Sequence, residues 1–144
     1  MQTGKILAID YGLSAIGLAI CDESRQFVFG RGVLNPIKGL KRVFDAILKI
    51  CKDDGIQCIL FGLPLDIDGK ETLQTKRIRN FSLKLSKYLS EQGVVMPLLF
   101  EDESFTSYEA DKNLAELGIK GSLRKEMEDE LAAVLILKRY LKLI

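Results

Sequence analysis

The chain has 144 residues, of which 47% are hydrophobic and 28% are charged, and its net charge at pH 7 is +1. These proportions are typical of a globular protein and exclude an intrinsically disordered chain. The absence of histidine excludes Ser-His-Asp and Cys-His nucleophilic catalysis, and also every zinc site with a histidine ligand. The length fits one domain, so we predict a single domain over residues 1–144.

Three segments near the N-terminus have the composition of strands. They are Lys5–Asp10, Ala15–Cys21 and Phe27–Leu34, and they lie close enough in the chain to form an antiparallel meander. The period then changes, because apolar residues from Leu40 to Ile50 follow helical spacing until Gly55 ends the helix.

The second half of the chain alternates strands and helices. A strand over Cys58–Leu63 precedes a polar loop over 65–70, a helix with apolar residues between Ile78 and Leu89, and a strand over Val94–Phe100. Thr106 and Glu109 predict a capping box for a helix that ends at Gly118, and a last helix runs from about Ser122. This order predicts an α/β fold, with a mixed five-stranded sheet of three antiparallel strands and then parallel additions, flanked by helices.

The three cysteines, Cys21, Cys51 and Cys58, are an odd number and include no CxxC pair. A disulfide framework or a cysteine-rich zinc site is therefore not predicted, and we expect buried thiols in a reducing compartment. The sequence shows no signal peptide and no apolar stretch of the ~18 residues that a membrane span needs. We therefore expect a cytoplasmic protein that does not enter a membrane.

Acidic residues follow two of the predicted parallel strands. Asp10 ends the first strand, and Asp102 and Glu103 follow the fifth. Sites in such sheets form beyond the carboxyl ends of the strands, so we expect these acids on neighbouring strand ends. Successive strand residues point to opposite faces, and the longer Glu103 is the better candidate to reach Asp10. The alternative is that each acid only belongs to a turn or caps a helix.

A further acid lies in the last predicted helix. On a helical wheel Asp129 falls on an apolar arc with Ala132 and Ala133, where a charge needs a partner or a metal. The alternative is an acid near the helix N-terminus that the helix dipole stabilises. Three acids without histidine fit oxygen coordination of Mg²⁺ or Mn²⁺, and two such ions can activate water and stabilise the leaving oxygen of a phosphodiester.

Basic residues gather in two places and predict contact with phosphates. The first group follows the predicted fourth strand and the second precedes the last helix: Lys70, Lys76, Arg77, Arg79, Lys84 and Lys87, then Lys120, Arg124 and Lys125. The alternative is that both groups are solvated helix faces. Neither group distinguishes RNA from DNA.

Taken together, these motifs resemble the YqgF family, also called RuvX, of the ribonuclease H-like superfamily. The matching segments are Ile9-Asp10-Tyr11-Gly12 with Ile16-Gly17-Leu18-Ala19, Gly62-Leu63-Pro64-Leu65 with Asp68-Gly69, Asp102-Glu103 with Thr106-Ser107, and Asp129 with Leu131-Ala132-Ala133. They occur in the order and spacing of the family and cover essentially the whole chain.

The resemblance implies a ribonuclease H-like fold and a metal-dependent endonuclease that acts in the 5′ processing of precursor 16S ribosomal RNA. It makes Asp10, Glu103 and Asp129 the catalytic acids, and Asp10, Asp102, Glu103 and Asp129 the ligands of Mg²⁺ or Mn²⁺. The alternative activity is that of a Holliday-junction resolvase-like DNA endonuclease. The expected partner is a nucleic acid, with RNA favoured over branched DNA, and the protein is expected to be a monomer or weak homodimer.

The chain departs from the family pattern at two places. Ser104 stands where the family usually has arginine after Asp-Glu, and Ser14-Ala15 replaces a basic pair after Asp-Tyr-Gly. Both changes remove positive charge beside the predicted site, so a catalytically weak nucleic-acid-binding module is a second alternative. A phosphotransferase of the actin-like superfamily is excluded, because 144 residues leave no room for its second lobe.

Overall fold

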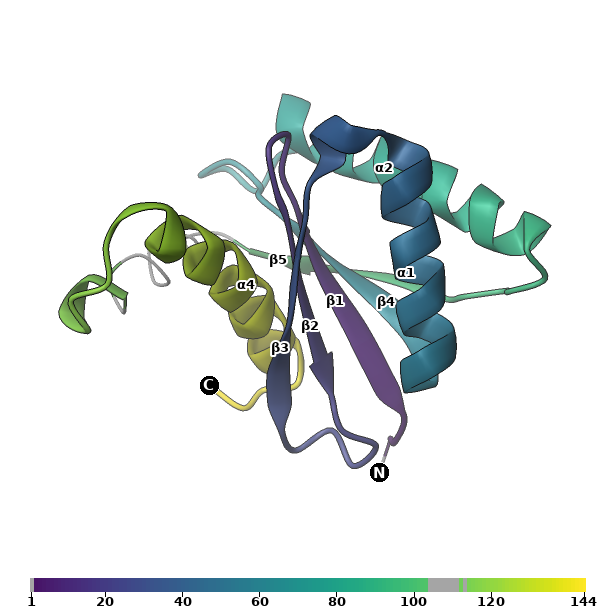
Figure 1. Cartoon of the computed structure of the whole chain (residues 1–144), viewed down its shortest axis with the longest axis horizontal. Coiled ribbons are helices and arrows are strands. Elements are labelled where there is room, and N and C mark those ends of the chain that lie inside the picture. The colour runs from purple at the N-terminus through teal and green to yellow at the C-terminus, as the bar shows by residue number, and fades with distance from the viewer. Residues whose placement is uncertain (1, 104–111, 113) are drawn as a thin grey trace.

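Five strands form one mixed sheet in the order β3-β2-β1-β4-β5 (Figure 1). The computed structural model of the protein describes residues 2–103, 112 and 114–144. The strands are β1 (Lys5–Tyr11), β2 (Ile16–Cys21), β3 (Val28–Leu34), β4 (Ile56–Leu63) and β5 (Leu98–Asp102). β1, β2 and β3 pair antiparallel, whereas β4 pairs parallel with both β1 and β5. The predicted mixed five-stranded sheet is confirmed.

Helices cover both faces of this sheet. α1 (Leu40–Asp54) and α2 (Leu73–Glu91) lie on one face, and α4 (Gly121–Tyr140) lies on the other (Figure 1). A short 3₁₀ helix, η1 (Pro36–Lys38), precedes α1. Among the described residues no helix is both long enough and apolar enough to cross a membrane.

The central strand β1 contributes to two separate cores. Leu7 and Ile9 pack with α1 and α2, whereas Ile6 and Ala8 pack with α4. Because successive strand residues point to opposite faces, a strand covered on both sides must be apolar at every position. Cys21, Cys51 and Cys58 are buried within these cores and form no disulfide, as predicted.

Among the strands, the fifth differs most from the sequence-based prediction. The fifth strand begins at Leu98 and extends to Asp102, four residues later than predicted at its start and two at its end. Pro97 has no N–H to donate, and it marks the entry to the strand: its carbonyl accepts a hydrogen bond from the Ile59 amide at 3.0 Å. The helix predicted from Thr106 to Gly118 lies mostly outside the described residues; of those that are described, Lys112 and Leu114–Glu116 are helical.

Candidate active site at the carboxyl ends of the parallel strands

Asp10 lies at the end of β1 and is partly buried on the face that α4 covers. Its position follows from strand alternation, because Ile6 and Ala8 point to the same face. Its partner across the antiparallel pair with β2 is Gly17, which has no side chain to crowd the carboxylate. The turn that joins β1 and β2 follows directly, so Asp10 lies at the rim of the sheet.

Glu103 reaches Asp10 from β5 across an intervening strand. The expectation that the two acids lie on neighbouring strand ends was wrong, because β4 lies between β1 and β5. At the crossing point β4 carries Gly62. A Cβ atom there would lie 2.9 Å from Oε2 of Glu103 and 2.5 Å from Cδ1 of Ile136. The missing side chain of Gly62 therefore opens the path along which Glu103 meets Asp10.

The two carboxyl groups are hydrogen bonded to each other and share a buried environment. Glu103 is only 8% exposed, and its amide donates to the Leu63 carbonyl at 3.1 Å, which holds the residue against β4. Burial, reinforced by the negative charge of Asp10, raises the pKa of Glu103 from 4.5 to about 10. Burial also raises the pKa of Asp10 from 3.8 to about 6, against the lowering effect of the hydrogen bond with Glu103. At pH 7 the pair therefore holds one proton and carries one negative charge.

Asp129 approaches the pair because α4 rests directly on β2. A Cβ atom at Gly17 would clash with the backbone oxygen of Asp129, so only glycine permits this approach of helix to strand. The side chain of Asp129 is 16% exposed and accepts a hydrogen bond from Lys125 Nζ at 3.2 Å. Its charge raises the pKa of Asp10, and the charge of Lys125 lowers it.

The helix-dipole alternative for Asp129 is wrong. α4 begins at Gly121, and its first turn contains no acidic residue. Asp129 lies about two turns further along, whereas the dipole acts within the first turn. The carboxylate is instead positioned by the close contact of α4 with the sheet.

Glu130 holds α4 to the edge strand β3, a contact that the sequence analysis missed. Its Oε2 atom accepts a hydrogen bond from the Gly32 amide at 2.6 Å, and a Cβ atom at Gly30 would clash with the Glu130 carboxyl group. The register between β2 and β3 shifts here, because Gly32 pairs with Leu18 and Gly30 pairs with Ala19. Arg31 is the extra residue of this bulge, which leaves the Gly32 amide for Glu130. Two glycines inside a predicted strand were the signal for a bulge.

Asp102 is exposed at the end of β5, and its backbone oxygen accepts a hydrogen bond from Arg139 at 3.4 Å. Its negative charge raises the pKa of Glu103. The structure therefore brings Glu103, and not Asp102, into contact with Asp10. That Asp102 coordinates a metal stays a prediction.

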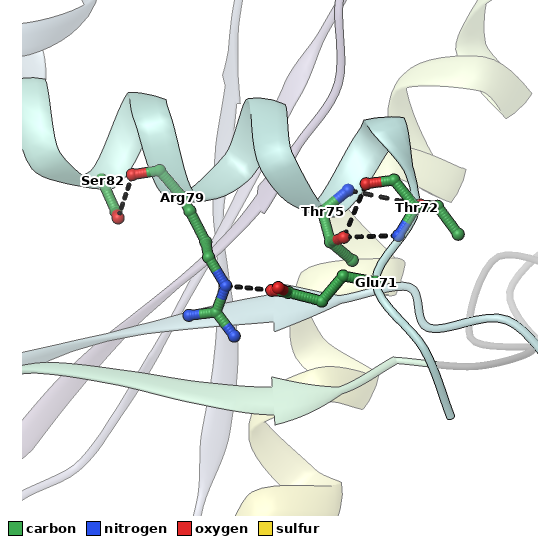
Figure 2. A network of polar contacts seen from close by, with 5 residues as sticks. All are labelled: Glu71, Thr72, Thr75, Arg79 and Ser82. Carbon is green, nitrogen blue, oxygen red and sulfur yellow. Dashed lines mark hydrogen bonds and ion pairs between the residues drawn. The ribbon is translucent and has the colours of Figure 1, made fainter. Parts of the chain in front are cut away.

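The basic residues lie in three different settings. Arg79 forms an ion pair with Glu71 (Figure 2). It also lies over the ring of Phe100, with 4.9 Å from its guanidinium carbon to the ring centroid. Lys70, Lys76 and Arg77 are exposed in or after the loop that follows β4. In α4, Lys125 is exposed beside Asp129 and Arg124 is half-buried.

The two basic groups belong to opposite layers of the molecule. α2 and α4 cover opposite faces of the sheet (Figure 1). Each group nevertheless has a member near the strand ends that carry the acids. Gln74 at the start of α2 donates a hydrogen bond to the Tyr11 carbonyl at 3.2 Å, and Lys125 of α4 pairs with Asp129. The acids therefore lie between basic residues at the start of α2 on one side and basic residues of α4 on the other.

The oxygen donors of the acidic pair are of the kind that binds a divalent cation. Asp10 and Glu103 offer only oxygen atoms, which suit Mg²⁺ and Mn²⁺. The proton that the two carboxyl groups share lies between them, where a cation would neutralise both charges. Among the described residues no three acidic or cysteine side chains are grouped closely enough to hold a metal ion. The oxygen atoms of the pair fit a hard cation, whereas a third ligand from Asp129 stays a prediction.

Residues 4–143 match the model of a protein family described as "RuvX: Holliday junction resolvase". The chain belongs to the RuvX family. This RuvX chain is 35% identical to a protein of Maridesulfovibrio salexigens, in an alignment that covers 95% of this chain and 97% of the relative. It is 34% identical to a protein of Dictyoglomus thermophilum, with 95% of this chain and 94% of the relative covered. Both relatives bear the name "Putative pre-16S rRNA nuclease".

Solved structures of RuvC share the fold of this RuvX chain. Thermus thermophilus RuvC in complex with a Holliday junction substrate superposes with a TM-score of 0.56 at 14% identity, and the alignment covers 96% of each chain. A second structure of Thermus thermophilus RuvC gives a TM-score of 0.53 at 15% identity. The likeness confirms the predicted ribonuclease H-like fold.

Proposed function

We propose that this chain is a metal-dependent endonuclease that hydrolyses phosphodiester bonds in the 5′ processing of precursor 16S ribosomal RNA. The observation that carries the proposal is the buried, hydrogen-bonded pair of Asp10 and Glu103 at the strand ends, with Asp129 beside it. The name of the relatives supports the substrate, and the family supports the hydrolytic reaction. A soluble ribosomal RNA precursor as substrate also supports action in the cytoplasm. That the chain is a monomer or weak homodimer stays a prediction.

In this proposal two of the acids bind the metal ion and the third adds negative charge beside it. Asp10 and Glu103 hold a divalent cation, Mg²⁺ or Mn²⁺, in place of their shared proton, and Asp129 completes the negative charge around it. When bound there, such an ion lowers the pKa of a water molecule and neutralises charge on the phosphate. Burial of Glu103 excludes bulk water from its side of the pair, which strengthens its attraction for a cation.

The basic side chains bind the phosphates on either side of the acids. Lys70, Lys76 and Arg77 serve this purpose from the α2 layer, and Arg124 and Lys125 from the α4 layer. Arg79 contributes less to binding than predicted from the sequence, because Glu71 and Phe100 already engage its guanidinium group. Lys125 has a second effect, because its ion pair with Asp129 offsets one negative charge at the site.

A Holliday-junction resolvase-like activity is the second candidate, and the description of the family model supports it. The two candidates differ in substrate and share the acidic residues. A catalytically weak nucleic-acid-binding module would differ from both, because it would bind nucleic acid without metal-dependent cleavage.

Cleavage assays with two substrates test these candidates. Purified protein is incubated with Mg²⁺ or Mn²⁺ and either an RNA that spans the 5′ end of precursor 16S ribosomal RNA or a four-way DNA junction. Cleavage of the RNA that Asp10→Asn and Glu103→Gln abolish would support the proposal, with Asp53→Asn, an exposed acid of α1, as the matched control. Cleavage of the junction alone would favour the second candidate, and binding without cleavage of either would overturn both.

A further inference from the structure

A small notch lies on the opposite face of the sheet from the acidic pair. It has a volume of about 90 Å³ and is lined by Tyr11, Leu40, Arg77, Asn80, Phe81 and Lys84. It lies where the start of α1 meets the second to fourth turns of α2, on the helical layer shown opposite α4 (Figure 1). Tyr11 directly follows Asp10 on β1, so the notch and the acidic pair occupy opposite faces of the same strand end.

The floor of the notch is aromatic and rigid. The rings of Tyr11 and Phe81 lie 4.6 Å apart between their centroids, and Phe81 is 3% exposed. Phe81 also packs against Phe44 of α1 at 5.5 Å, which ties the two helices together beneath the opening. The floor is therefore held by the core and does not depend on a ligand.

The wall of the notch is cationic and polar. Arg77, Asn80 and Lys84 are spaced three and four residues apart, so they form one stripe along α2, and all three are exposed. No ion pair or hydrogen bond engages their side chains within the described part of the chain. Three surface cations elsewhere differ in this respect: Arg31, Lys41 and Lys49 each pair with an aspartate.

The surroundings of the notch are also positive. Lys38 and Arg42 lie two residues before and after Leu40, and Lys87 continues the stripe along α2. The acid among them, Asp45, is engaged by Lys41 and by the hydroxyl group of Tyr88. Such a field attracts anions, and its two unpaired cations at the wall would hold one in place.

We propose that this notch binds a backbone phosphate of the nucleic-acid strand whose neighbouring nucleotides occupy the acidic site. The cavity is small, at about 90 Å³, which suits a phosphate group rather than a nucleobase. Arg77 and Lys84 supply the charge, and the Asn80 amide supplies a neutral donor between them. The assignment rests on the proposed function, because it gives the strand a path from the acids over the end of β1 to α2.

Binding without cleavage tests the notch directly. The probe is a fluorescein-labelled single-stranded RNA of 16 nucleotides, whose anisotropy is measured with EDTA between 50 and 200 mM KCl. Each phosphate contact on a single strand contributes a salt slope of roughly 0.7, which is worth about fivefold in affinity at 0.1 M salt. The double variant Arg77→Gln, Lys84→Gln removes this one phosphate contact, so it should bind roughly fivefold more weakly and lose about 0.7 from its salt slope.

The matched control removes the same charge from the far end of α1. Lys49→Gln with Lys52→Gln changes two exposed lysines and should leave affinity and salt slope near their wild-type values. Asn80→Asp, which adds a negative charge at almost constant shape, should weaken binding in the same direction as the double variant. Equal losses in the notch and control variants would overturn the proposal, because they would show an effect of net charge alone.

Two further measurements separate the notch from the acidic site. A DNA strand of the same sequence should lose affinity by the same factor, and a loss confined to RNA would contradict a phosphate site. In cleavage assays the double variant should raise KM and leave kcat unchanged, whereas a fall in kcat at saturating RNA would contradict a contact remote from the reacting bond. If the wild-type chain cleaves no RNA but the notch variants still weaken binding, the proposed function fails and the notch stands.

Discussion

Replacing Glu103 by glutamine should stabilise the protein at neutral pH. The folded pair keeps a proton on Glu103 up to about pH 10, whereas the unfolded chain releases it near pH 4.5. Between these values the folded state binds more protons, so stability falls as pH rises. From pH 4.5 to pH 7 the free energy of unfolding falls by about 3 kcal/mol, at 1.36 kcal/mol for each pH unit.

Glutamine removes this cost and keeps the contact, because its amide can donate to Asp10 as the protonated carboxyl group does. Glu103→Gln should therefore be about 2–3 kcal/mol more stable than the wild type at pH 7, a rise in Tm of roughly 5–10 °C. The gain should vanish near pH 4, where both states are protonated, and should widen toward pH 9.

Thermal and urea unfolding at pH 4, 7 and 9 measure this difference directly. Glu101→Gln is the matched control, because it makes the same chemical change two residues earlier on β5, where Glu101 pairs with Gly62 in the parallel register. A gain of equal size at pH 4 and pH 7 would refute the argument, because it would come from packing rather than from the proton. A Glu103→Gln variant that is no more stable than the wild type at any pH would refute it as well.

Three further changes test the rest of the site. Gly62→Ala should lower the free energy of unfolding by about 1–3 kcal/mol, because its methyl group displaces Glu103 from Asp10. The same displacement should flatten the fall of stability between pH 4.5 and 7. Urea unfolding at several pH values measures both effects. Glu130→Ala should lower the free energy of unfolding by about 1.5–3 kcal/mol, because it leaves the Gly32 amide without its charged acceptor. Glu130→Gln keeps an acceptor and should recover most of that loss. Equal losses in the two variants would show that the hydrogen bond contributes nothing. Asp129→Asn should leave the metal-free fold equally or slightly more stable, because its charge raises the pKa of Asp10, and millimolar Mg²⁺ should then raise the Tm of the wild type more than that of the variant. Identical magnesium shifts in the two proteins would contradict a ligand role for Asp129.

The sequence alone predicted most of the elements and the two acids, Asp10 and Glu103, that the structure brings into contact. The spacing of apolar residues predicted strands and helices in the right order. The apolar residues of β1 follow one another directly, whereas those of α1 recur at helical spacing, because side chains alternate between faces in a strand and return to one face every three or four residues in a helix. The motifs around Asp10, Glu103 and Asp129 identified the family, since each acid follows or lies within a segment of recognisable pattern. Strand alternation implied that at most one of Asp102 and Glu103 faces Asp10, and the longer side chain favoured Glu103, which agrees with their burial.

Only the tertiary structure decided how these acids meet. β4 lies between β1 and β5, and the acids touch because Gly62 leaves space that no local pattern reports. Gly17 lets α4 approach β2, and Glu130 fastens that helix to the bulge of β3, contacts that join residues more than 90 positions apart. The raised pKa values of Asp10 and Glu103 have the same origin, because burial is a property of the assembled layers. Local sequence determines which face a side chain occupies, whereas the space and the dielectric around it are fixed by segments that come together only on folding.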